Sequence, residues 1–413
     1  MKLIIRFGLI LFTLPLLFWG CGENNGISTS STNLETQKKI NELNRARVRS
    51  DVIGTTTIGE MELLDFGTVT LNNTSSSSMT LSLPDGASSF TLIGDGTQSG
   101  AQDVDISSLV NPNGETWITF DFFDTDPIGT NTAQAFGDTT VAVVFPHAVY
   151  SVPSGDYTFT IGNYFQENTI QVYGIINNRT NPTGGTLDLN LIMVSIPDYT
   201  GADDPNLAKM VEEVRRIYAL HNISLGTISH FTLNRPDLTS VSSIDANLNG
   251  QFDTMDSLFQ TSSGTGNNAM NFYFVQEMEG GILGISGGIP GPPLIQGTAH
   301  SGVVISAFGG FTQMGDALLI LQGGTMAHEG GHYLGLFHPT ESPGTFHDPI
   351  SDTPECGPER DTDGSGTVEP EECADLTGSN LMFWGAPLPE SGIVQDQLTS
   401  GQKFVIDRNP LIY

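Results

Sequence analysis

The stretch GGTMAHEGGHYLGLFHP, residues 323–339, constrains this chain more than any other segment. Three of the chain's 8 histidines fall within eleven positions of it. Residues four apart lie one turn apart on one face of a helix, so His328 and His332 would present their imidazoles side by side. Gly335 favours a helix stop, after which the chain can turn sharply and bring His338 back. The segment therefore predicts a helix that ends in a tight turn.

This pattern also predicts a catalytic zinc site. Three protein ligands with one open position are typical of catalytic zinc, whereas structural zinc sites are closed by four ligands. Glu329 adjoins the first histidine, where a general base can polarise a water at the metal. The alternative is a helix whose histidines are satisfied by neighbouring carboxylates. The spacing favours His328, His332 and His338 as zinc ligands and Glu329 as the catalytic residue.

The residues from His328 to His338 resemble the long zinc motif of the metzincin metallopeptidases. Those enzymes carry a methionine in a tight turn beneath the metal, and GSNLMFWG supplies Met382. The chain is most similar to the pappalysin/ulilysin family, because HDPISDTPEC and QLTSGQKFVI resemble two further segments of that family. The resemblance covers about residues 187–413. It implies an α/β zincin domain and a calcium site near Asp348, Asp352 and Thr353.

The resemblance implies a zinc endopeptidase that hydrolyses peptide bonds of proteins by attack of an activated water. Many metzincins have a tyrosine two residues after the turn methionine, where its hydroxyl supports the transition state. Here that residue is Trp384, whose indole N–H can donate a hydrogen bond but has no ionisable hydroxyl. Two rivals stay open: a surface binding or adhesion protein with a degenerate peptidase domain, and a zinc hydrolase of a non-protein amide.

Two acidic loops resemble EF-hand calcium loops. DTDGSGTVEPEE, residues 361–372, has oxygen-bearing side chains at positions 1, 3 and 5, glycine at 6 and glutamate at 12. DANLNGQFDTMD, residues 245–256, repeats the pattern with a shorter aspartate at 12, which predicts weaker binding. A solvated acidic turn is the alternative for each. The candidate ligands are Asp361, Asp363, Ser365, Thr367 and Glu372 in one loop, and Asp245, Asn247, Asn249, Gln251 and Asp256 in the other.

The N-terminus predicts an exported protein. An apolar run of signal-peptide length follows Lys2 and Arg6 and ends at Cys21, which resembles the lipidated cysteine of bacterial lipoproteins. An ordinary cleaved signal is the alternative. We expect an outer-membrane lipoprotein of the cell envelope, or an extracellular protein. In an exported chain the remaining pair, Cys356 and Cys373, predicts one disulfide rather than a two-cysteine zinc site.

The net charge of the chain limits the kinds of molecule that it can bind. The chain has 46 Asp+Glu against 15 Lys+Arg, for a formal net charge of −31. Such a surface repels nucleic acid and anionic lipid. We therefore expect a protein or peptide substrate, no nucleic acid, membrane contact through the lipid anchor only, and a monomer.

The chain divides by pattern into four parts. Residues 1–21 form the signal peptide, and 22–50 a tether with a charged helix. Short runs rich in β-branched and aromatic residues between 51 and 181 predict an all-β, sandwich-like module, accessory or pro-like. Strands and helices mix over 185–413, which predicts the α/β catalytic domain with the calcium-loop insertions. Within it, SGVVISAFG is the candidate edge strand for substrate pairing, with an ordinary core strand as the alternative.

Overall fold

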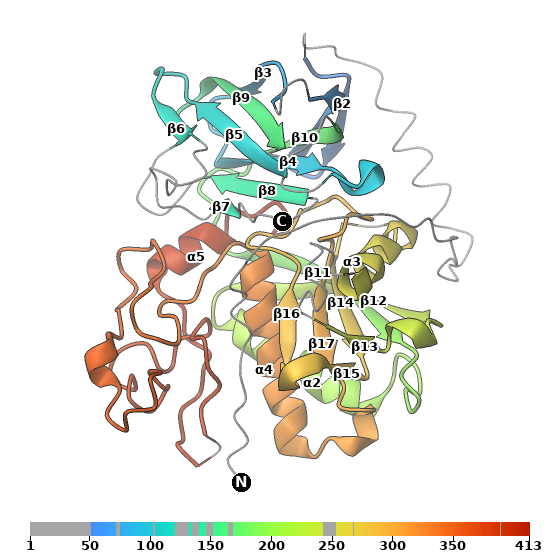
Figure 1. Ribbon diagram of the computed structural model, residues 1–413, viewed down its shortest axis with the longest axis vertical. Helices are drawn as coiled ribbons and strands as arrows, with labels where there is room; N and C mark the ends of the chain where they lie inside the picture. The colour runs from blue at the N-terminus through green and yellow to red at the C-terminus, as the bar shows by residue number, and fades with distance from the viewer. Residues whose placement is uncertain are drawn as a thin grey trace.

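The computed structural model describes residues 51–71, 75–101, 104–119, 132–133, 140–145, 152–163, 168–242, 253–266, 268–388 and 390–413. The expected signal peptide, Cys21 and the tether lie outside these ranges, as do Asp245, Asn247, Asn249 and Gln251. Within them the chain is mixed α/β with several sheets (Figure 1). No helix in the described ranges has the length and apolar character needed to span a bilayer.

The first part of the described chain is built from antiparallel strands. In β3 (Met79–Leu83) the residues alternate between buried and half-buried positions, with Met79, Leu81 and Leu83 buried. One sheet has the order β1-β2-β10-β4-β8-β7 and the other the order β3-β9-β5-β6. The remaining strands are β1 (Gly54–Ile58), β2 (Met61–Thr70), β4 (Ser89–Asp95), β5 (Val104–Val110), β6 (Thr116–Thr119), β7 (Thr132–Ala133), β8 (Thr140–Phe145), β9 (Gly155–Asn163) and β10 (Thr169–Asn177).

The second part contains a five-stranded sheet with helices around it (Figure 1). Its order is β12-β11-β14-β17-β16, and every pairing is parallel except that of β16 with β17. Two short strands, β13 and β15, pair separately. The elements are β11 (Gly185–Val194), α2 (Pro205–Ala219), β12 (Ile223–Leu233), β13 (Ser240–Val241), α3 (Asp253–Gln260), β14 (Met270–Val275), β15 (Glu277–Met278), β16 (Gly284–Ser286), β17 (Val303–Ser306), α4 (Asp316–Tyr333) and α5 (Ser400–Ile406).

Alternate residues of this sheet face two different cores. Leu191, Phe272 and Ile305 pack with α2 and α4, whereas their neighbours Ile192 and Tyr273 pack in the core that holds α3. Both faces of the sheet are therefore covered, which explains why β14 and β17 are buried along their whole length.

The structure corrects one prediction about this sheet. The segment SGVVISAFG was the candidate edge strand, but β17 within it lies between β14 and β16. All four residues of β17 are buried, as expected of an interior strand. The edge strand on this side of the sheet is β16, whose sequence is only Gly-Ile-Ser.

The two parts meet along the C-terminal residues. The backbone oxygen of Arg408 accepts hydrogen bonds from Ser89 Oγ at 2.7 Å and Asn177 Nδ2 at 3.1 Å. Met61 and Ile175 of the first sheet belong to the core that also contains α4. The β-strands of the first part are thus packed against the same core that supports the histidine-bearing helix.

Candidate metal centre

Helix α4 carries the first two histidines, and its last turns are buried on every side. The two glycines between the histidines have a packing reason. A Cβ on Gly330 would collide with the hydroxyl of Tyr218, and one on Gly331 would collide with the sulfur of Met382. Glycine weakens a helix by about 1 kcal/mol relative to alanine. The two glycines therefore lower the stability of α4 but allow Tyr218 and Met382 to pack directly against its backbone.

The helix ends as the sequence predicts, at a glycine in the left-handed region. Gly335 has φ of 110°. The Leu336 N–H donates to the Gly331 oxygen at 3.0 Å, and the Gly335 N–H donates to the His332 oxygen at 2.8 Å. These two bonds are those of a Schellman motif, which reverses the chain direction. The reversal brings His338 back to the helix.

The ring nitrogens of the three histidines converge. His338 Nε2 lies 3.0 Å from Nε2 of His332 and 3.3 Å from Nε2 of His328. The opposite nitrogens face oxygen atoms: Nδ1 of His328 is 2.7 Å from the Leu381 oxygen, and Nδ1 of His332 is 2.6 Å from the Leu336 oxygen. A carbonyl oxygen can only accept, so both Nδ1 atoms carry the proton and both Nε2 atoms present lone pairs.

Converging lone pairs favour a cation between them. Nδ1 of His338 lies 3.0 Å from Glu341 Oε2, at ion-pair distance but without hydrogen-bond geometry. Such carboxylate and carbonyl partners are the usual supports of metal-ligating histidines. All ligand nitrogens lie within 4.8 Å of one another. The residues present therefore fit a zinc ion bound by His328, His332 and His338.

Burial sets the protonation of the site. It lowers the pKa of His328 to about 3 and that of His332 well below its usual value, so both rings stay neutral at neutral pH. It raises the pKa of Glu329 to about 8. The Glu329 side chain lies against β16, since a Cβ on Gly284 would be 2.9 Å from its Cγ. The carboxyl group thus sits between the histidine cluster and the edge of the sheet.

Met382, the predicted turn methionine, lies against the histidine-bearing helix α4. Its sulfur faces Gly331 of α4, and the preceding residue supplies the carbonyl that orients His328. Asn380 holds the turn: its Oδ1 accepts from the Met382 N–H at 2.9 Å, and its Nδ2 donates to Gln402 Oε1 at 2.8 Å. Gln402 belongs to α5, so that helix braces the turn.

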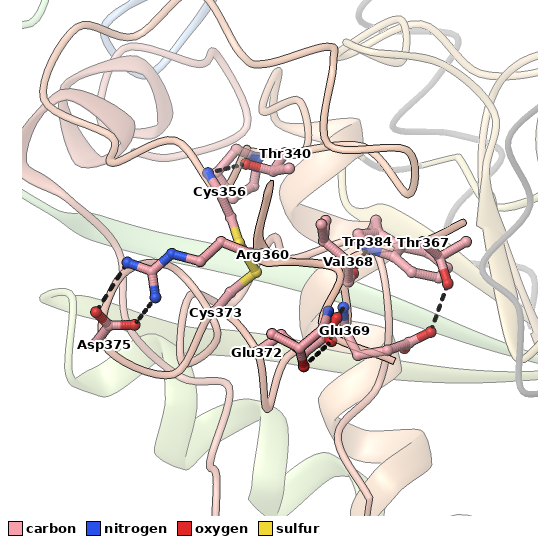
Figure 2. The surroundings of a disulfide bond; sticks show 12 residues. Thr340, Cys356, Arg360, Thr367, Val368, Glu369, Glu372, Cys373, Asp375 and Trp384 are labelled. Atoms are coloured by element: carbon pink, nitrogen blue, oxygen red, sulfur yellow. Dashed lines mark hydrogen bonds and ion pairs between the residues drawn. A yellow bond between two sulfur atoms is a disulfide. The ribbon is translucent and has the colours of Figure 1, made fainter. Parts of the chain in front are cut away.

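Trp384 is held against the neighbouring loop 361–372. Its Nε1 donates to the backbone oxygen of Val368 at 2.7 Å, and Figure 2 shows the two residues side by side. The residue is 6% exposed. The indole has a single N–H, and this contact uses it. Support of a transition state by Trp384 stays a prediction, one that this contact does not favour.

The acidic loop 361–372 brings three of its carboxylates together. Carboxylate oxygens of Asp361, Asp363 and Glu372 lie within 4.8 Å of one another. Asp361 accepts from the N–H groups of Ser365 and Gly366, and the Gly366 bond contributes most to lowering its pKa. A disulfide joins Cys356 to Cys373 across the loop, with Cα atoms 5.9 Å apart (Figure 2).

The other calcium candidates are not gathered in the same way. Asp352 accepts from Thr399 Oγ1 and the Gly401 N–H at 2.9 Å each, so it caps α5. Asp348 accepts from the Ile350 N–H, and burial raises its pKa to about 7. Thr353 is buried and its side chain interacts with Asp348, while the charge of Asp352 contributes to raising the pKa of Asp348. Asp256, the one described residue among the candidate ligands of the second loop, lies in α3.

Two features of the site were missed by sequence reasoning. The three-residue spacing from His338 to Glu341 could have indicated the carboxylate partner. The Leu381 oxygen left no such signal, because a backbone carbonyl is available at every residue.

Comparison with known proteins gives little further guidance. No protein-family model and no curated protein matches the chain. In structure it is similar to archaemetzincin from Methanopyrus kandleri, with 14% identity, a TM-score of 0.30, and coverage of 55% of this chain and 98% of that one. It is also similar to metalloproteinase-II from Bacteroides fragilis, with 11% identity, a TM-score of 0.29, and coverage of 57% and 62%. Such TM-scores are too low to establish a shared fold.

Proposed function

We propose that the protein is a zinc-dependent endopeptidase acting on proteins or peptides. The observation that carries the proposal is the convergence of three imidazole Nε2 atoms beside the buried carboxyl of Glu329. A zinc ion bound by these histidines supplies a Lewis acid that polarises a carbonyl and makes water more acidic.

Glu329 performs the proton transfers in this proposal. It takes a proton from the attacking water and returns it to the nitrogen of the leaving amine. Burial raises its pKa to about 8 in the absence of a cation, and a cation held by the histidines would favour the charged carboxylate that accepts the proton. No covalent bond to the enzyme forms, because water is the nucleophile.

The strand β16 offers a place for the substrate. It is the last strand of its sheet, and Gly284 within it touches the Glu329 side chain. An extended peptide can pair with such an edge through main-chain hydrogen bonds, which are indifferent to its side chains. This arrangement would hold a peptide bond beside the base.

Metal analysis of the purified protein tests the proposal. We expect one zinc ion per chain, because the described residues contain one cluster of three histidines. Removal of the metal with a chelator should abolish cleavage of unfolded casein. Zinc alone should then restore cleavage, and calcium alone should not. A metal-free preparation that still cleaves casein would refute the proposal.

We further propose that calcium binds the loop 361–372 and stabilises it. The grouping of Asp361, Asp363 and Glu372 supports this, since carboxylate oxygens at positions 1, 3 and 12 are calcium ligands in EF-hand loops. Without the cation, three like charges held this closely would repel one another. The disulfide keeps the ends of the loop together in either state.

Thermal unfolding with and without calcium checks this second proposal. At about one hundred times its Kd, a ligand that binds only the folded state stabilises it by about 2.7 kcal/mol. We expect calcium to raise the Tm of the wild type and of Glu390→Gln, which alters an exposed carboxylate outside the loop. Glu372→Gln should lose the increase. An equal increase in all three proteins would contradict calcium binding in this loop.

A further inference from the structure

We infer that Trp384 is a positioning residue that ties the histidine cluster to the disulfide-closed loop 356–373. The inference rests on the proposed zinc function. It concerns how the ligands are held and assigns Trp384 no contact with substrate.

The first observation is the packing of Trp384 itself. It forms a small apolar cluster with Cys356, Val368, Cys373 and Phe383, separate from the main core. Its indole N–H is bound to the Val368 oxygen. The side chain is thus fixed both by packing and by a directional bond.

The second observation is that Trp384 directly follows a hydrogen-bonded turn. The Leu381 N–H donates to the Gln397 oxygen at 2.8 Å, and the Phe383 N–H donates to the Asn380 oxygen at 3.1 Å. The Leu381 carbonyl in the same turn orients His328. A shift of Trp384 would therefore move the carbonyl on which the imidazole depends.

The third observation is that the same loop also reaches the support of His338. The Val368 N–H donates to the Ser342 oxygen at 2.8 Å. The Cys356 N–H donates to Thr340 Oγ1 at 3.0 Å. Glu341, between these two acceptors, faces Nδ1 of His338.

The loop 356–373 thus contacts both segments that hold a histidine: the turn whose Leu381 carbonyl faces His328, and the segment whose Glu341 faces His338. Val368 is the central residue, because its N–H holds the segment after His338 and its oxygen holds Trp384. Phenylalanine has no N–H to replace the indole, although it fills much of the same space. Loss of an outer partner of a metal ligand costs about 10- to 100-fold in affinity, and Trp384 acts one step further out.

The test uses the full chain and measures zinc affinity by competition with a coloured chelator. We expect Trp384→Phe to weaken zinc binding by about 3- to 10-fold, with a smaller change in Tm than Trp384→Ala. The matched control is Trp117→Phe, which alters another buried tryptophan, in β6. That variant should bind zinc like the wild type.

A second experiment alters the loop 356–373 and leaves Trp384 unchanged. Removal of the disulfide by Cys356→Ser with Cys373→Ser should also weaken zinc binding. Adding Trp384→Phe to that variant should then cost less than it does in the wild type, because coupled residues are not additive. Independent, additive effects would overturn the inference, as would unchanged zinc affinity in Trp384→Phe.

The failures of the two proposals can be told apart. If the wild type binds zinc and cleaves peptides while the Trp384 variants bind zinc equally well, the positioning role alone is wrong. If the wild type neither binds zinc nor cleaves peptides, both proposals are wrong. A Trp384→Phe protein that fails to fold leaves the cysteine variant to decide, through its zinc affinity.

Discussion

Glu329→Gln is expected to lower kcat/KM for peptide cleavage by about a thousandfold, within the range typical of a lost general base. Glutamine has nearly the same shape as glutamate but cannot accept the proton from water. The variant should still bind zinc, because Glu329 is not one of the three converging ligands. It should also fold normally, since burial already disfavours the charged carboxylate at this position.

The control for this experiment is Glu212→Gln, the same chemical change at a largely exposed side chain of α2. Both proteins are compared with the wild type in steady-state cleavage of a quenched fluorescent peptide, together with their zinc content. Retention of more than a tenth of the wild-type kcat/KM by Glu329→Gln would remove this residue from the mechanism.

His338→Ala is expected to weaken zinc binding by at least about 100-fold, because loss of an outer partner alone costs up to that amount. The substitution leaves two imidazoles, and two ligands do not complete a catalytic zinc site. Because His338 is buried, no side chain from the surface can readily take its place as the third zinc ligand. Peptide cleavage should fall in parallel at limiting zinc.

The matched control is His230→Ala in β12, where the imidazole contacts Tyr199 and is remote from the cluster in sequence. Zinc content is measured after dialysis against a weak chelator. We expect wild type and His230→Ala to keep the metal and His338→Ala to lose it. Equal retention by all three would show that the ion is held elsewhere.

Much of the site could be predicted from local sequence, because its geometry is set by short-range rules. Helical spacing places His328 above His332, and the left-handed glycine Gly335 returns the chain to His338. The same reasoning holds for the loop 361–372, where glycine and short oxygen-bearing side chains fix the turn. In each case the residues that interact lie within about a dozen positions.

The parts that could not be predicted depend on distant pairing. Strand β16 has only three residues, one of them glycine, so its sequence shows no strand periodicity. Its identity comes from β17, with which it pairs. The role of Trp384 was likewise hidden, because its partner is a backbone oxygen sixteen residues away in another loop. The family resemblance has a tyrosine at this position, and that tyrosine predicts a contact with the substrate and not with a loop.

Residues 408–413 have a consequence for how a disturbance spreads through the molecule. The Arg408 oxygen accepts from Ser89 and Asn177, Asn409 Nδ2 donates to the Leu334 oxygen at 3.1 Å, and the backbones of Tyr413 and Thr186 hydrogen-bond to each other. The same short segment therefore contacts the antiparallel strands, β11 and the end of the histidine-bearing helix. Loss of these contacts would loosen both the junction of the two parts and the turn that presents His338.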